Sequence, residues 1–167
     1  INVNTNGSLN LISGSVDIGG TRTAVAMQAA ETLGLAVEDI FPTVGDTDAV
    51  GYTANTGGSR TAFDTGLAAI AAAEEVKKQM ASRAALIWEV QDEDVSFESG
   101  TFICSKNPAD KLTFQEIASR QMRTGGPITC SASADSTGVG AIFAGNIIDV
   151  EVDPDTGKVD ILRCTAF

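Results

Sequence analysis

The sequence predicts an α+β fold in which mixed sheets have helices packed on one side. Two segments, residues 21–33 and 59–87, are rich in helix-forming residues and repeat apolar residues at helical spacing. Residues 148–153 and 159–165 instead have strand-like composition and flank a Pro-Asp-Thr-Gly turn, which predicts a long hairpin. Because strands and helices are grouped rather than strictly alternating, the pattern favours α+β over a doubly wound parallel sheet.

The first part of the chain is predicted to form a strand, a helix and a second strand. A strand over residues 8–18 ends at Gly19-Gly20, and a helix follows over residues 21–33. Four-residue spacing places three residues on the buried face of this helix: Val25, Ala29 and Leu33. Gly34 is a stop signal, and a short strand is expected over residues 39–44.

A second helix is predicted to begin near Ser59 and to continue, with a kink, to about Ile87. Its buried side is expected to contain Phe63, Leu67 and Ile70, and Trp88 is expected in the core. Glu74 and Lys78 have the spacing of an ion pair on the solvent side.

The remaining residues are predicted to be mainly strands. Val95 and Phe97 alternate with polar residues, and a turn at Ser99-Gly100 precedes a strand over residues 101–104. Thr113 and Glu116 form a capping box for a helix to about Met122. A subdivision is expected between residues 1–90, which contain the glycine-rich loops, and the strand-rich residues 91–167.

The composition excludes several classes of function. A net charge of -11, from 22 acidic and 11 basic residues, argues against binding to nucleic acid or to an anionic membrane. No apolar run approaches the roughly 20 residues that span a bilayer. No signal-peptide pattern opens the chain, so a cytoplasmic location is expected. Histidine is absent, which removes Ser-His-Asp and Cys-His catalysis and histidine-ligated metals.

The cysteines do not indicate a metal site. They are three in number and contain no C-x-x-C spacing, so neither a zinc site nor a disulfide framework is predicted. They are expected to be small buried apolar residues: Cys104, Cys130 and Cys164.

Two glycine-rich loops are the candidate ligand-binding sites. The first contains Gly19, Gly20, Thr21, Arg22 and Thr23, and the second contains Thr56, Gly57, Gly58, Ser59, Arg60 and Thr61. Each places paired glycines before a predicted helix, where free backbone N–H groups favour an anion. Arginine and hydroxyl side chains add donors suited to phosphate. Because both loops have this arrangement of glycines, hydroxyls and arginine, the sequence favours an anion-binding site.

The same residues are compatible with several alternatives. The first loop could be a plain turn in which Thr21 caps the helix. Its DIGGT motif resembles the phosphate loop of sugar kinases of the actin-like ATPase superfamily, although a strand rather than a helix should then follow. A non-catalytic domain that binds a phosphate compound, or that packs between partners, is a further alternative. Asp46 and Asp48 form a carboxylate pair near the second loop, for which solvation of the loop is the simpler interpretation.

Five segments together resemble the large, molybdopterin-binding subunit of the molybdenum hydroxylases, the family of xanthine dehydrogenase, aldehyde oxidoreductase and aerobic carbon monoxide dehydrogenase. They are GSVDIGGTRTAVAMQAAETLGLAVEDIFPTVGDTD, ANTGGSRTAFDTGLA, EDVSFESGTF, LTFQEIA and GAIFAGNIIDVEVDPDTGKVDILR. The segments occur in the family's order and cover the chain from about residue 8 to its end. The resemblance implies an internal fragment of the cofactor-binding domain, with that domain's α+β fold.

The resemblance implies that molybdenum in this family is held by the dithiolene of a pterin and not by protein side chains. The pterin is often carried as a cytosine dinucleotide. Gly57 and Gly58 would then lie close to the molybdenum, while Ser59, Arg60 and Thr61 would bind the pterin or its phosphates. The matching first loop would be a second cofactor loop formed by Gly19, Gly20, Thr21, Arg22 and Thr23. Many family members have G-Q-G there, with the glutamine beside the metal's oxo ligand. Gly19-Gly20 is one residue shorter and lacks that glutamine.

The implied parent enzyme oxidises or hydroxylates a small-molecule substrate with oxygen from water. Its implied partners are the remainder of the large subunit, an iron–sulfur subunit and an FAD subunit, which accept the electrons. The family's catalytic glutamate lies beyond the hairpin, so no catalytic base is assigned and the isolated segment is expected to be inactive. Carbon monoxide, aldehydes and N-heterocycles are not distinguished as substrates.

Overall fold

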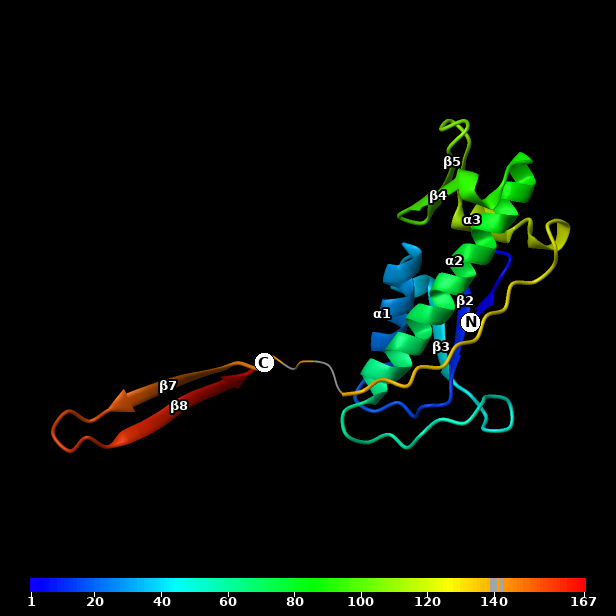
Figure 1. Ribbon diagram of the computed structural model, residues 1–167. Helices are drawn as coiled ribbons and strands as arrows, with labels where there is room; N and C mark the ends of the chain where they lie inside the picture. The colour runs from blue at the N-terminus through cyan, green and yellow to red at the C-terminus, as the bar shows by residue number, and fades with distance from the viewer. Residues whose placement is uncertain (139–140, 142) are drawn as a thin grey trace.

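The fold is given by a computed structural model that describes residues 1–138, 141 and 143–167. These residues form two three-stranded sheets, two long helices and a C-terminal hairpin (Figure 1). In chain order the principal elements are β1 (Asn2–Val3), β2 (Leu9–Ser13), α1 (Thr21–Leu33), β3 (Ile40–Val44), α2 (Gly66–Trp88), β4 (Val95–Glu98), β5 (Thr101–Cys104), β6 (Lys111–Thr113), α3 (Phe114–Ala118), β7 (Asn146–Val152) and β8 (Val159–Ala166). This mixture confirms the predicted α+β fold.

The first sheet is mixed and has helices on one face. Its order is β1-β2-β3, with β1 antiparallel and β3 parallel to β2, and α1 makes the crossover between the parallel pair. Leu9, Leu11 and Ile40 are buried in the core shared with α1, whereas Asn10 and Ile12 lie on the exposed face. This alternation confirms that the helices cover one side of the sheet.

The strand that leads to the first loop is shorter than predicted. It ends at Ser13 and not at residue 18, because pairing with β3 ends at the Ser13–Val44 register. The Ser13 hydroxyl then accepts a hydrogen bond from the Ser15 backbone N–H (3.1 Å), which turns the chain away from the sheet. Residues 14–20 therefore form a loop of bends and turns before α1.

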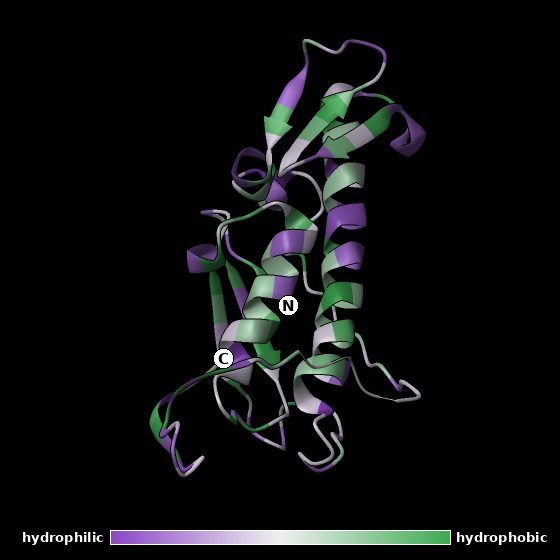
Figure 2. Cartoon of the chain, turned by 90° about the vertical axis from the view of Figure 1, so that its left-hand side faces the viewer, coloured by the Kyte–Doolittle hydropathy of each residue, from purple (hydrophilic) through white to green (hydrophobic). Residues whose placement is uncertain are grey.

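Helix α1 has the predicted bounds and buried face, and it ends at Gly34 in the left-handed conformation. The two long helices carry alternating apolar and hydrophilic bands (Figure 2). The predicted buried face of α2 is wrong, because Leu67 is 36% exposed and Phe63 and Ile70 are only partly buried. Small residues face the core instead: Gly66, Ala69, Ala72, Ala73, Ala84 and Ala85 are buried together with Val76 and Met80. Because α1 also buries mainly alanines, the two helices pack closely.

Two local details of the second helix also differ from the prediction. The helical segment starts with a π-helical turn, Thr61–Thr65, before regular α2 begins at Gly66. Glu74 pairs with Lys77 (Oε1 to Nζ, 2.6 Å) and not with Lys78, since residues three apart also lie on one helix face. Trp88 is partly buried and packs against the core, in agreement with its prediction.

The second sheet has the order β4-β5-β6, and β6 leads directly into α3. The predicted capping box is present: the Thr113 hydroxyl accepts the Glu116 N–H (3.2 Å), and a Glu116 carboxylate oxygen accepts the Thr113 N–H (2.8 Å). Helix α3 ends at Ala118, earlier than predicted. The buried Gln121 side chain instead bonds the backbone of Val3 and Ile128, which links the N-terminal strand to the segment after α3.

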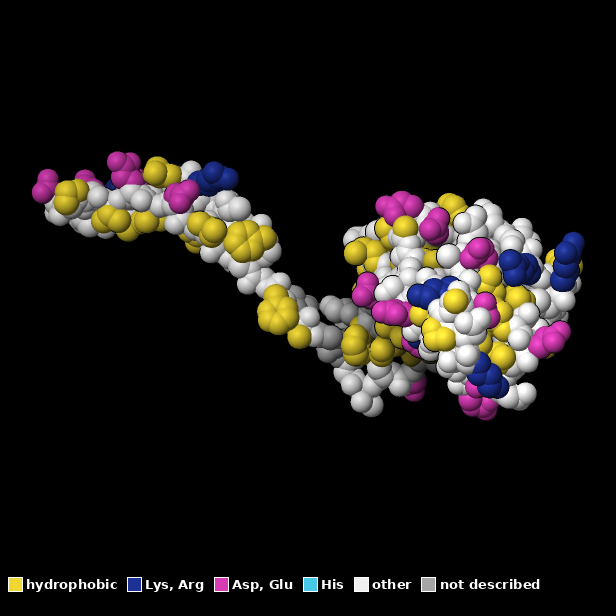
Figure 3. Space-filling view, turned by 90° about the horizontal axis from the view of Figure 1, so that it is seen from above, with side chains coloured by type: hydrophobic (Ala, Val, Ile, Leu, Met, Phe, Trp, Pro, Cys, Tyr) yellow, Lys and Arg dark blue, Asp and Glu magenta, His cyan; other side chains and the backbone are white. Residues whose placement is uncertain are grey.

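Among the described residues, the C-terminal strands β7 and β8 pair only with each other and form a two-stranded sheet. In Figure 1 this hairpin extends away from the helices, and hydrophobic side chains are exposed along it (Figure 3). Its exposure explains one wrong prediction: Cys164 lies on the hairpin and is exposed, whereas Cys104 and Cys130 are buried. Among the described residues, no helix combines the length and the apolar character that crossing a membrane requires.

Candidate functional site

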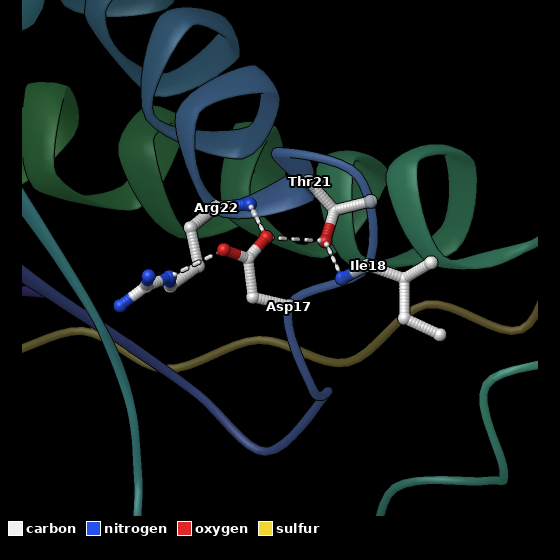
Figure 4. A network of polar contacts seen from close by, with 4 residues as sticks. All are labelled: Asp17, Ile18, Thr21 and Arg22. Atoms are coloured by element: carbon white, nitrogen blue, oxygen red, sulfur yellow. Dashed lines mark hydrogen bonds and ion pairs between the residues drawn. The ribbon is translucent and has the colours of Figure 1, made fainter.

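The first glycine loop is organised by Asp17, which lies just before it (Figure 4). One carboxylate oxygen accepts hydrogen bonds from the Arg22 backbone N–H (3.0 Å) and the Thr21 hydroxyl (3.1 Å). The other accepts from the Arg22 Nε (2.9 Å). Gly20 is the N-cap of α1 at φ 85° and makes no side-chain cap, so the alternative in which Thr21 caps the helix is wrong. The Asp17 carboxylate therefore accepts a backbone N–H group of the first turn of α1 and also holds the Arg22 side chain.

These bonds make the first loop sensitive to acid. The hydrogen bonds from the Arg22 backbone and side chain lower the pKa of Asp17. A lowered pKa means that ionised Asp17 stabilises the folded chain above the pKa of about 3.9 for unfolded aspartate, and that this contribution is lost as the pH falls through the folded value.

We therefore expect Asp17→Asn to destabilise the chain at pH 6, and we expect the difference from the wild type to shrink as the pH falls below about 4. Urea unfolding of both chains across this range measures the difference. A difference in free energy of unfolding that stays constant down to about pH 2.5 would contradict the assignment.

The second glycine loop places consecutive residues in the left-handed region before the π-helical turn. Gly58 has φ 60° and Ser59 has φ 59°. This conformation is uncommon for a non-glycine residue and is often retained at functional sites. No heavy atom of the residues that the structure describes lies within 4 Å of a Cβ placed at Gly58, Gly19 or Gly20, so these glycines face open space. Both loops therefore leave their backbone accessible to a ligand.

Arg60 and Thr61 connect the second loop to the interior. The Arg60 Nε bonds Asp64 Oδ2 (2.7 Å), and the Ser136 hydroxyl bonds Asp64 Oδ1. Thr61 and Asp64 are each 8% exposed. The hydrogen bond from Ser136, together with the Arg60 side chain, lowers the pKa of Asp64, so its charge is maintained.

The two loops meet at the π-helical turn. The hydroxyls of Ser15 and Thr65 lie 2.9 Å apart, which joins the segment before the first loop to the turn after the second. Gln28 of α1 donates to the Ala62 carbonyl (3.3 Å). A small pocket at this junction is lined by residues of both segments: Leu11, Ser13, Ser15, Thr21, Arg22, Val25, Pro42, Thr43, Thr61 and Thr65.

The structure thus brings together some of the predicted site residues. Thr21, Arg22 and Thr61 share the pocket. The others lie outside its lining: Gly19, Gly20, Thr23, Thr56, Gly57, Gly58, Ser59 and Arg60. The Asp46 side chain accepts the Asp48 N–H (2.9 Å), which gives this pair a local turn-forming role.

The residues that hold the loops in place were not predicted from the sequence. Asp64 binds Arg60 directly and Ser136 acts through Asp64, while Ser15 and Thr65 join the segments that flank the two loops. The ion pair of Arg60 and Asp64 could have been predicted, because the two residues are four apart within a helical segment. No local pattern relates Ser136 to Asp64, because 72 residues separate them.

The donor set suits a phosphate or pterin ligand better than a bare metal ion. It contains two guanidinium groups, several hydroxyls and open backbone at three glycines. Within the part of the chain that the structure describes, no three His, Cys, Asp or Glu side chains are grouped to hold a metal.

Comparison with known proteins gives the family. Residues 1–167 match the molybdopterin cofactor-binding domain model. This chain belongs to the molybdopterin cofactor-binding domain family. The match confirms the resemblance to molybdenum hydroxylase large subunits.

Individual relatives agree with this family. The chain is 27% identical to subunit gamma of the 6-hydroxypseudooxynicotine dehydrogenase complex of Paenarthrobacter nicotinovorans, over 98% of this chain and 21% of the relative. It is 25% identical to the xanthine dehydrogenase molybdenum-binding subunit of Escherichia coli O157:H7, over 96% of this chain and 22% of the relative. The chain therefore spans about a fifth of the length of these relatives.

Solved structures share the fold of this cofactor-binding domain. Carbon monoxide dehydrogenase from Oligotropha carboxidovorans superposes with a TM-score of 0.78 and 25% identity, covering 99% of this chain and 21% of that one. Quinoline 2-oxidoreductase from Pseudomonas putida 86, at 22% identity, shares the fold with a TM-score of 0.67 over 99% of this chain and 22% of that one. The kinase alternative does not fit, because helix α1 and not a strand follows the DIGGT motif.

Proposed function

We propose that this domain holds the molybdopterin cofactor through its two glycine loops, as part of the large subunit of a molybdenum-dependent oxidoreductase. The pocket that Thr21 and Arg22 of the first loop share with Thr61 of the second, in a chain that matches the cofactor-binding family over its whole length, is the observation that supports this proposal. Arg22, Arg60 and Thr61 are the proposed side-chain donors, while the Thr21 hydroxyl already donates to Asp17 and supports the loop. The remaining loop residues contribute mainly backbone: Gly19, Gly20, Thr23, Thr56, Gly57, Gly58 and Ser59.

The residues fit such a ligand by their chemistry. Phosphate and pterin groups accept hydrogen bonds from guanidinium, hydroxyl and backbone N–H groups, and both loops offer all three. The open space at Gly19, Gly20 and Gly58 allows a flat or bulky ligand to approach the backbone. When bound, the molybdenum–pterin group supplies the redox chemistry, while the protein binds and orients it.

The glutamates of this chain are not proposed as the catalytic base. Glu116 is engaged in the α3 capping box, and Glu74 pairs with Lys77. We propose that the base lies in another part of the large subunit, and that iron–sulfur and FAD subunits complete the enzyme. Relatives described as a dehydrogenase complex subunit and as a molybdenum-binding subunit support this arrangement. A cytosine dinucleotide form of the cofactor is part of the same proposal.

We expect Arg60→Ala in the full-length subunit to lower the molybdenum content several-fold, because it removes a charge-assisted donor to the cofactor. Molybdenum per subunit, and CMP released by hydrolysis, are measured after expression in a cofactor-competent host. Arg123→Ala is the matched control, since Arg123 is exposed in the 3-10 turn after α3.

Unchanged molybdenum and CMP in folded Arg60→Ala enzyme would remove Arg60 from the proposed site. Molybdenum without CMP in the wild type would instead retain the site and reject the cytosine dinucleotide.

A further inference from the structure

The residues that the structure describes hold the arginine of the second loop from one side. Its Nε and Nη2 both contact the same oxygen of Asp64, Oδ2, at 2.7 Å. The two side chains are 32% and 10% exposed, so the contact lies at the boundary between solvent and interior. Among the described residues, the Arg60 Nη1 has no hydrogen-bond partner. The guanidinium is therefore fixed along one edge and retains donors on another.

The second oxygen of Asp64 is fixed independently. Oδ1 accepts the hydroxyl of Ser136, which lies in the segment after α3 and not on the helix. The carboxylate thus cannot rotate without losing one of two bonds. The backbone contributes as well, because the Asp64 N–H bonds the Arg60 carbonyl at 2.7 Å within the turn. Asp64 is consequently more rigid than an exposed helix carboxylate.

The first loop contains the same pairing in a different local structure. Asp17 accepts the Nε of Arg22 through one oxygen, and it precedes its arginine by five residues. Asp64 follows its arginine by four residues. Two unrelated local conformations thus place an aspartate on the Nε edge of each loop arginine.

We infer that Asp64 is a positioning residue for the cofactor: it orients the guanidinium of Arg60 so that the unpaired edge meets the bound anion. This inference rests on the proposed function of the second loop. An arginine fixed before binding loses less side-chain entropy when the ligand arrives. The nearby negative charge also repels an anion, so the experiment must show that orientation outweighs repulsion.

The test is a double-mutant cycle in the full-length subunit of the assembled enzyme. Asp64→Asn keeps the shape and removes the charge that holds Arg60. We expect at least a fivefold loss of molybdenum per subunit and faster release of molybdenum during gel filtration. In the Arg60→Ala background the same substitution should cause no further loss. Asp135→Asn is the matched control, because it removes an equal charge from the exposed neighbour of Ser136.

Three outcomes overturn the inference. They are unchanged molybdenum retention in Asp64→Asn, increased retention, and an equal loss in the Arg60→Ala background, which would indicate a purely structural role. If Asp64→Asn does not fold, Ser136→Ala gives the same decision: reduced retention supports positioning, and wild-type retention rejects it. Full retention in Arg60→Ala itself rejects the proposed function instead, so the two failures are distinguishable.

Discussion

Gly58→Val in the full-length subunit is expected to reduce molybdenum content by at least tenfold. Gly58 has φ 60°, a conformation that a β-branched residue adopts only at a cost of about 1–3 kcal/mol. A Cβ at this position meets no atom of the described residues within 4 Å, so the new side chain projects into the space in front of the loop. If that space receives the cofactor, valine both strains the loop and blocks the approach.

Two control variants separate these effects. Gly51→Val adds the same side chain to an open position in the preceding loop that lacks a positive φ, and it should retain molybdenum. Gly58→Asn tolerates the left-handed conformation but still fills the space, so it should lose molybdenum if blocking dominates. Equal molybdenum content in Gly58→Val and wild type would show that the cofactor does not approach this glycine.

Gly34→Ala is expected to give the largest loss of stability, about 2–5 kcal/mol, from a left-handed alanine together with overpacking. Gly34 ends α1 at φ 60°. A Cβ there would lie 2.4 Å from the Gly100 nitrogen and 2.6 Å from the Ser99 carbonyl carbon. These are backbone atoms of the β4–β5 turn, which is itself fixed by the hydrogen bond from the Phe114 N–H to the Gly100 carbonyl (2.9 Å). No side-chain rotation relieves the contact.

Gly126→Ala is the matched control for this substitution. Gly126 also has a positive φ, 90°, but within the described part of the chain its Cβ would meet nothing within 4 Å. Gly126→Ala should therefore lower the free energy of unfolding by only about 1–2 kcal/mol, which is the cost of a left-handed alanine. Free energies of unfolding in urea measure both variants, and equal losses would mean that the Gly34 contact does not constrain the fold.

Much of the local structure could be predicted because its signals lie within a few residues. Helix α1 follows from helix-forming residues that end at a glycine, and the Thr113–Glu116 capping box follows from its spacing. The β7–β8 hairpin likewise follows from the alternation of apolar and acidic residues over residues 148–153 and from the Pro-Asp-Thr-Gly turn that comes next. The buried face of α2 was not predictable in this way, since the choice of alanines over Leu67 depends on how closely α1 approaches.

By itself the sequence determined the α+β class, both glycine loops and the resemblance to the molybdenum hydroxylases, since residue type and short spacing suffice for these. Only the tertiary structure decided which loop residues share a pocket and which groups hold the arginines. Ser15 meets Thr65 across 50 residues, and Ser136 meets Asp64 across 72. Such contacts depend on the packing of α1 against α2 and on the path of the segment after α3. No local pattern encodes them, because folding and not sequence spacing brings these residues together.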